Sequence, residues 1–180
     1  MGDAHEAHAR SIAHGAVDVL APRTLAAASA AAGHQVIAEV KLYGDVVLRF
    51  ISNHGGFGGG GGGFMPGYHG VAVSPAGGAP LCYGLRRVDH AVGNVPNLLE
   101  AVDYITGFTG MHEFAEFTSA DVGTVDSGLN SMVLANNNEM ILMPVNEPTF
   151  GTKRKSQIQT YLEQNAGAGL QHLALKTGRA

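Results

Sequence analysis

Residues 86–94 read RRVDHAVGN, a short strand-like run with a histidine, His90, in its middle. A shorter echo, LQHLAL, spans residues 170–175 and centres on His172. In both runs a polar residue precedes the histidine and apolar residues follow it. The shared pattern predicts that the two histidines occupy equivalent positions in a repeated unit. A polar ring in an apolar strand also needs a partner to offset its desolvation.

The composition predicts a packed globular protein. The chain has 180 residues, of which 45% are hydrophobic and 14% are charged, enough for one large or two small domains. A net charge of −4 gives no case for nucleic acid binding. No apolar run is long enough to cross a membrane. The single cysteine, Cys82, fits a reducing compartment, so we expect a cytoplasmic protein, with a plastid location left open.

The first part of the chain predicts a helix, then extended chain and a hairpin. The helix covers residues 4–14, and an alanine-rich run at residues 25–32 also favours helix. Two β-branched runs flank Gly44-Asp45 and predict a hairpin over residues 36–51 with a type II′ turn. The glycine run at 55–63 lacks the Gly-Lys-Ser/Thr of a phosphate loop, so we expect a surface loop there.

The second part predicts strand, helix and three further strands, followed by a short helix and a new strand. The expected elements are a strand at 87–92, a helix from Asn94–Pro96 to Thr109, strands at 112–117, 129–134 and 140–145, a helix at 156–164 and a strand from Leu170. The first part repeats the end of this pattern. The expected fold class is therefore α+β, with two βαβββ modules that are incomplete at both ends.

The alternation of side chains along a strand predicts which residues share a face with each histidine. It places each histidine with the residues two positions before and after it, which are Val88 and Val92 for His90 and Leu170 and Ala174 for His172. If the strands open sister modules, both histidines line one cavity and can bind a metal. The alternative is a pair of core histidines bonded to backbone carbonyls. The other histidines are expected in an exposed helix (His5, His8, His14), in loops (His34, His54, His69) and at the start of a strand (His112).

Two histidines and one carboxylate on one face of an octahedron form the non-heme Fe(II) arrangement. The carboxylate candidates are Glu113, Glu116, Asp121 and Glu147, and none has pattern support as a ligand. Polar residues in apolar surroundings form a second set, which comprises Ser131, Asn146, Gln157, Gln159 and Gln171. These residues are either satisfied core groups or hydrogen-bonding groups for an anionic or phenolic ligand.

Several longer runs resemble the plant 4-hydroxyphenylpyruvate dioxygenases. The most specific are YGLRRVDHAVGNVP at 83–96, GTKRKSQIQT at 151–160 and GLQHLAL at 169–175. Shorter matches lie at 38–50, 114–118, 121–124, 127–131 and 146–148. The resemblance covers roughly residues 8 to 175.

The resemblance implies a vicinal-oxygen-chelate fold, in which paired βαβββ modules form open barrels. Residues 1–70 would be the second half of an N-terminal domain, and residues 71–84 a linker. Residues 85–180 would be the first module of the catalytic domain with the opening strand of the next. The chain would thus be a fragment, inactive by itself.

The resemblance also implies site roles. His90 and His172 match the two iron-binding histidines, and the third ligand, a glutamate, is not in this chain. Three residues match positions that face the substrate, namely Ser131, Asn146 and Gln157. Three others match positions near the pocket wall, namely Val92, Pro144 and Gln171. The implied cofactor is Fe(II).

The implied reaction converts 4-hydroxyphenylpyruvate and O2 into homogentisate and CO2. It serves tyrosine and phenylalanine breakdown and, in plants, plastoquinone and tocopherol synthesis. A homodimer is expected for the full-length enzyme. Two alternatives stay open, a non-catalytic small-molecule binding module on the same fold and an enzyme like hydroxymandelate synthase.

Overall fold

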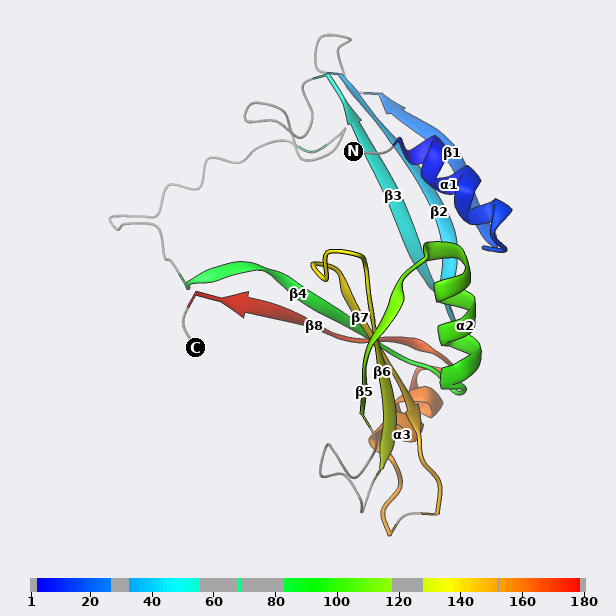
Figure 1. The fold of residues 1–180 in the computed structure, drawn as a ribbon, viewed down its shortest axis with the longest axis vertical. Helices are drawn as coiled ribbons and strands as arrows, with labels where there is room; N and C mark the ends of the chain where they lie inside the picture. Colours follow the sequence, from blue (N-terminus) through cyan, green and yellow to red (C-terminus); the bar gives the residue numbers. More distant parts are fainter. Residues whose placement is uncertain are drawn as a thin grey trace. The chain divides into compact units, whose positions relative to one another are not determined.

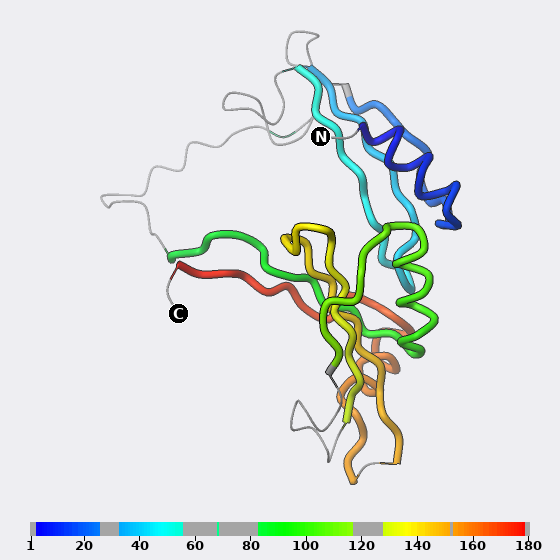
Figure 2. Tube along the Cα trace, in the orientation of Figure 1, coloured from blue at the N-terminus to red at the C-terminus, as the bar shows by residue number. Residues whose placement is uncertain are grey.

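The computed structural model describes residues 3–26, 33–55, 68, 83–117, 128–151 and 153–178 (Figures 1 and 2). The chain divides into two compact units. The first comprises residues 1–40 and 47–82, and the second comprises residues 41–46 and 83–180. Within the described ranges, no helix has both the length and the apolar character needed to cross a membrane.

The first unit has one helix and a three-stranded sheet in the order β1-β2-β3. Its elements are α1 (Ala4–Ala13), β1 (Asp18–Ala26), β2 (His34–Tyr43) and β3 (Val46–His54). The predicted first helix is confirmed, and the Asp3 side chain caps it by accepting a hydrogen bond from the His5 backbone N–H. The predicted hairpin is confirmed as well. Gly44 has φ +55° while Asp45 stays outside the positive-φ region, as a type II′ turn requires.

Two predictions for this unit are wrong. Leu25 and Ala26 belong to β1 and pair with Gln35 and His34, so strand pairing overrides the helix propensity of the alanine-rich run. The remainder of that run, residues 27–32, lies outside the described residues. His34 and His54 are strand residues rather than loop residues, and their rings stack with centres 4.6 Å apart.

His8 corrects the expectation of exposed helical histidines. It is buried, and its Nε2 atom lies 2.8 Å from Asp18 Oδ1. The predicted loop beyond Gly55 and most of the predicted linker lie outside the described residues.

The second unit contains the predicted βαβββ module. Its elements are β4 (Leu85–Asn94), α2 (Leu98–Thr109), β5 (His112–Phe117), β6 (Leu129–Ala135), β7 (Leu142–Pro148), α3 (Gln157–Gln164) and β8 (Gly169–Thr177). The sheet order is β5-β6-β7-β4-β8. β4 runs parallel to β7 and antiparallel to β8. The opening strand of the module therefore lies beside the strand that follows the module.

The start of α2 differs from the prediction. Asn97 caps the helix by accepting a hydrogen bond from Glu100 N at 3.2 Å, so Asn94, Val95 and Pro96 precede it. The cause is strand pairing, because Asn94 still lies opposite Asn146 and the Val95 N–H donates to the Asn146 carbonyl at 2.8 Å. The prediction therefore placed the end of β4 at the start of the helix.

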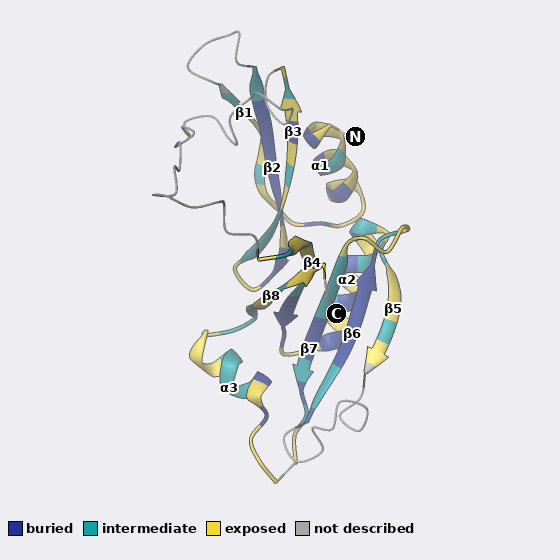
Figure 3. Ribbon diagram, turned by 90° about the vertical axis from the view of Figure 1, so that its left-hand side faces the viewer, coloured by how far each residue is buried: buried dark blue, intermediate teal, exposed yellow. Residues whose placement is uncertain are grey.

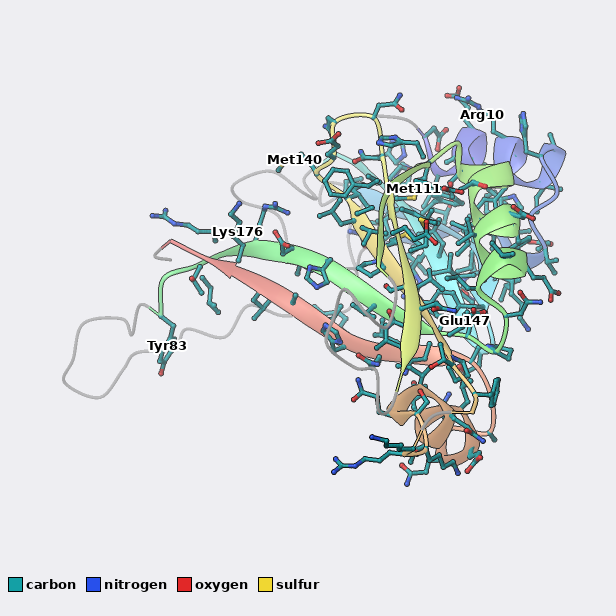
Figure 4. All side chains as sticks on the ribbon, turned by 60° about the horizontal axis from the view of Figure 1, so that its bottom comes forward. Arg10, Tyr83, Met111, Met140, Glu147 and Lys176 are labelled. Carbon is teal, nitrogen blue, oxygen red and sulfur yellow. The ribbon has the colours of Figure 1, made fainter. Side chains whose placement is uncertain are left out.

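α2 packs on one face of this sheet. Leu98, Val102, Ile105 and Phe108 are buried at the predicted three- and four-residue spacing, and Leu134 and Val145 of the sheet are also fully buried. Figure 3 shows buried segments along α2, β6 and β7. Glu147 points to the same side. Its Oε2 accepts from Leu98 N at 2.8 Å, and its Oε1 accepts from Asn130 Nδ2 at 2.9 Å (Figure 4). The other face of the sheet is the face of His90 and Asn146.

The tip of the β2–β3 hairpin, residues 41–46, packs within the second unit. Tyr104 Oη donates to the Lys41 carbonyl at 2.8 Å. Tyr43 is buried, and its ring contacts Gly93 so closely that a side chain at Gly93 would overlap it. Burial, as the main cause, and the nearby Tyr161 raise the pKa of Tyr43 to about 12.

Candidate metal and substrate site

His90 and His172 meet on one face of the sheet. On the antiparallel pair β4–β8, His90 lies opposite Ala174 and His172 lies opposite Val92, so the two histidines are diagonal neighbours. Their rings approach edge to face, with centres 5.8 Å apart and planes at 73°. The structure thus brings together the two histidines that sequence reasoning singled out.

Each histidine follows an extra residue in its strand. Val88 lies opposite Leu175 and His90 opposite Ala174, which leaves Asp89 without a counterpart in β8. Similarly, Val92 lies opposite His172 and Gly93 opposite Leu170, which leaves Gln171 without a counterpart in β4. Extra residues of this kind re-aim neighbouring side chains.

These bulges correct the predicted faces. Strict alternation would place Val88 with His90 and Leu170 with His172. Because one residue is inserted between the members of each pair, Val88 and Leu170 lie on the opposite face from the histidines. Val92 and Ala174 remain on the histidine face, as predicted.

The bulge residues supply partners for the two imidazoles. His90 Nδ1 lies 3.0 Å from Asp89 Oδ2, and His172 Nδ1 lies 2.8 Å from Gln171 Oε1. A carboxylate or an amide oxygen can only accept, so in the neutral ring Nδ1 carries the proton and Nε2 carries the lone pair. This is the arrangement of metal-binding histidines, which donate their other N–H to an oxygen.

The two carboxylate oxygens of Asp89 interact with different partners, Oδ1 with Arg87 and Oδ2 with His90. Arg87 Nη2 lies 3.0 Å from Asp89 Oδ1. The hydrogen bond from His90 is the main cause that lowers the pKa of the Asp89 carboxyl, and the charges of Arg87, His90 and Lys176 act in the same direction, against desolvation. Asp89 is therefore an anionic acceptor for His90.

The ring separation lies within the range that a shared metal ion allows. With a metal about 2.1 Å from each ring nitrogen, ring centres lie roughly 4.5 Å apart for two cis ligands of an octahedron and at most roughly 6.4 Å apart for trans ligands. The observed 5.8 Å is below the upper limit and above the cis value, so the rings would move roughly 1 Å closer to hold an octahedral ion on one face. Among the described residues, no group of three or more His, Cys, Asp or Glu side chains could hold a metal by itself. The two imidazoles are thus a partial donor set.

The four carboxylate candidates do not complete this set. Glu147 is occupied by its two hydrogen bonds on the α2 face. Glu113 and Glu116 are exposed residues of β5, the edge strand that three strands separate from β8. Asp121 lies outside the described residues.

A row of polar side chains crosses the same face as the histidines. Ser131 of β6 lies opposite Asn146 of β7, which lies opposite Asn94 of β4. All three are buried, Asn94 completely. Pro144 and Val92 are each two residues before a member of this row and therefore share its face. Five of the six predicted substrate-site residues gather on this face, and Gln171 is one of the five.

Gln157 is the exception. It is the first residue of α3, is exposed, and takes no part in the hydrogen bonds of this row. The structure does not bring it together with the other predicted residues.

Sequence reasoning missed Asn94 and the role of Asp89. Asn94 Oδ1 accepts from Gln171 Nε2 at 2.9 Å and from Asn146 Nδ2 at 3.3 Å. The signal for Asn94 was an amide at the end of an apolar strand, which the pattern assigned to the helix cap. The signal for Asp89 was the polar residue before His90, repeated as Gln171 before His172.

No protein-family model matches the chain. The chain is 57% identical over 181 residues to a 4-hydroxyphenylpyruvate dioxygenase of Arabidopsis thaliana, covering 96% of this chain and 37% of that protein. It is 66% identical over 139 residues to the 4-hydroxyphenylpyruvate dioxygenase of Daucus carota, covering 77% of this chain and 30% of that protein. The chain thus spans well under half the length of these relatives.

Among solved structures, the chain is similar to a mutant of 4-hydroxymandelate synthase from Streptomyces coelicolor. The TM-score is 0.68 at 20% identity, and the match covers 96% of this chain and 46% of the other. That protein has the vicinal-oxygen-chelate fold, so the predicted fold class is confirmed. At this identity the likeness concerns the fold alone.

Proposed function

Because the chain belongs to the 4-hydroxyphenylpyruvate dioxygenase family, we propose that it is part of an enzyme that converts 4-hydroxyphenylpyruvate and O2 into homogentisate and CO2. The observation that carries the proposal is the convergence of His90 and His172, with ring centres 5.8 Å apart, in a chain 57% identical to such an enzyme. The proposal covers the whole protein, of whose relatives the chain spans 37% or less in the two comparisons above.

His90 and His172 would hold Fe(II) through their Nε2 atoms. Their Nδ1 partners, Asp89 and Gln171, support this assignment because they leave both Nε2 lone pairs available. The third ligand would be a carboxylate from a part of the protein outside this chain. When bound, Fe(II) supplies coordination positions for a keto acid and O2 and carries the oxidation.

The other residues of the face would bind and orient the substrate. Ser131, Asn146 and Gln171 offer neutral hydrogen-bonding groups, which suit a phenolic and carboxylate-bearing ligand in a mostly apolar site. Val92 and Pro144 would form the apolar wall and exclude water. Gln157 would join them only if α3 presents its first turn to the bound substrate.

The same premise extends to the organisation of the protein. We assign residues 1–70 to an N-terminal domain, residues 71–84 to a linker, and residues 85–180 to a catalytic domain. A homodimer, a role in tyrosine breakdown and in plastoquinone and tocopherol synthesis, and a cytosolic or plastid location belong to this proposal.

A chimera tests the proposal. Residues 3–178 of this chain would replace the aligned segment of the Arabidopsis relative, and homogentisate would be measured with added Fe(II). We expect product formation that is lost in His90→Ala and His172→Ala. His112→Ala is the matched control, because His112 is an exposed histidine of β5 and its loss should leave activity unchanged.

Two results would overturn the proposal. One is a folded chimera, judged by its thermal unfolding, that forms no homogentisate. The other is a chimera that forms 4-hydroxymandelate instead, which would favour a synthase of the kind that shares the fold.

A further inference from the structure

Asn94 is a buried amide on β4, the middle one of three adjacent strands. It is the last residue of β4, it is 0% exposed, and it lies opposite Asn146 of β7 and Gly169 of β8. Buried amides are almost always hydrogen-bonded because an unpaired buried polar group destabilises the fold. The bonds that Asn94 makes therefore indicate what its position requires.

Two donors converge on a single atom of Asn94. Gln171 Nε2 donates to Asn94 Oδ1 at 2.9 Å, and Asn146 Nδ2 donates to the same oxygen at 3.3 Å. Asn94 Nδ2 is buried and has no hydrogen-bond partner among the described residues. The amide is thus oriented by its oxygen.

This orientation fixes the direction of a longer hydrogen-bond chain. Because Gln171 gives its Nε2 to Asn94, it turns its Oε1 toward His172 Nδ1, 2.8 Å away. An amide oxygen cannot donate, so His172 must carry its proton on Nδ1 and its lone pair on Nε2. With the Gln171 amide reversed, its NH2 would face His172 and the ring proton would move to Nε2.

We propose that Asn94 is a positioning residue that fixes the tautomer of His172. Through Gln171 it keeps Nε2 of His172 free to bind a ligand, and through the same oxygen it orients Asn146. That the ligand of Nε2 is a metal rests on the proposed function. The tautomer itself follows from the hydrogen bonds of this chain.

His90 provides an internal control. Its Nδ1 partner is Asp89, whose carboxylate pairs with Arg87, whereas the side-chain hydrogen bonds of Asn94 go to Gln171 and Asn146. A substitution at Asn94 should therefore change His172 and leave His90 as it is. A purely structural role of Asn94 would lower stability without this selectivity.

The test uses the metal-free chain with 15N-labelled histidine, at about pH 8, where a free imidazole is neutral. Nitrogen chemical shifts and couplings report the tautomer of each ring. In the unmodified chain we expect both His90 and His172 in the Nδ1–H form. In Asn94→Ala we expect His172 to move to the Nε2–H form as the major species and His90 to stay. Asn94→Asp keeps an oxygen acceptor and should restore the Nδ1–H form of His172.

Asn130→Ala is the matched control. Asn130 also donates an amide hydrogen bond within this sheet, to Glu147 on the α2 face, and its loss should leave both tautomers unchanged. If Asn94→Ala does not fold, Asn94→Leu has a similar shape without polar atoms and carries the same expectation.

The proposal is overturned if His172 keeps the Nδ1–H form in a folded Ala or Leu variant, or if His90 shifts as much as His172. It is also overturned if the Asp variant loses the Nδ1–H form. Because the measurement needs neither metal nor turnover, an inactive chimera would leave this result standing, and an active one would not establish it.

Discussion

His90 and His172 lie diagonally across the β4–β8 ladder, and their rings meet edge to face with centres 5.8 Å apart. They come from the two runs of sequence that share the polar-histidine-apolar pattern. The pairing of β4 with β8 makes one site from both.

Removal of either histidine should weaken metal binding by the chain. Co2+ is a suitable probe because it accepts imidazole ligands and has a visible spectrum. We expect His90→Ala and His172→Ala each to weaken Co2+ binding by at least about tenfold, because each removes one of two converging nitrogens. Titration calorimetry measures the effect, and His112→Ala should bind like the unmodified chain. Unchanged binding in His90→Ala would contradict the shared site.

The chain by itself should not turn over 4-hydroxyphenylpyruvate. Two imidazoles fill two of the three protein positions in a facial iron site, and no further described group completes it. We expect homogentisate from the isolated chain with added Fe(II) to equal that of its His90→Ala variant. Chromatography of the product checks this, and any excess over the variant would show that the chain holds iron productively.

Glu147→Gln should destabilise the second unit through the start of α2. The carboxylate accepts from Leu98 N and from Asn130 Nδ2, and an amide can offer an oxygen to only one of them. We expect a loss of about 1–2 kcal/mol in the free energy of unfolding, measured with urea. The control is Glu100→Gln, which also removes one negative charge, here from the first turn of α2. It should cost less than about 1 kcal/mol in the free energy of unfolding. Equal losses would mean that charge, and not capping, is the cause.

Gly93→Ala should destabilise the chain because Tyr43 occupies the space that a Cβ atom needs. The added atom would lie 2.9 Å from Tyr43 Cε1 and closer still to Cζ and to the hydroxyl oxygen Oη. We expect a loss of about 1–3 kcal/mol in the free energy of unfolding. The matched control is Gly107→Ala in α2, where a Cβ meets nothing within 4 Å, and it should stabilise by about 0.5–1 kcal/mol. The Tyr43→Leu background should reduce the cost of Gly93→Ala, and an unchanged cost would refute the clash.

Tyr43 should make stability fall at alkaline pH. Its pKa is raised to about 12 in the folded chain from 10.0, so between these values the unfolded chain has lost a proton that the folded chain keeps. Stability then decreases as pH rises, by roughly 2 kcal/mol from pH 10 to pH 12. Urea unfolding across this range measures the loss, which should be smaller in Tyr43→Phe. The same slope in the Phe variant would assign the loss to another group.

Local patterns were sufficient to predict the element types of the second unit. The apolar spacing of α2 and the alternation of the strands follow from helix and strand periods, which a short run of residues displays. Leu25 and Asn94 show the limit of this reasoning, because both have local features of helices and both are held in strands by partners distant in sequence.

The sequence by itself determined that His90 and His172 occupy equivalent places, since a repeated pattern of polar and apolar residues produces repeated strands. Only the tertiary structure decided that these strands are neighbours, and that bulges at Asp89 and Gln171 supply each ring with its hydrogen-bond partner. It also decided that Asn94 joins Gln171 to Asn146. Register and bulges depend on pairing between distant segments, whose geometry no local run of residues encodes.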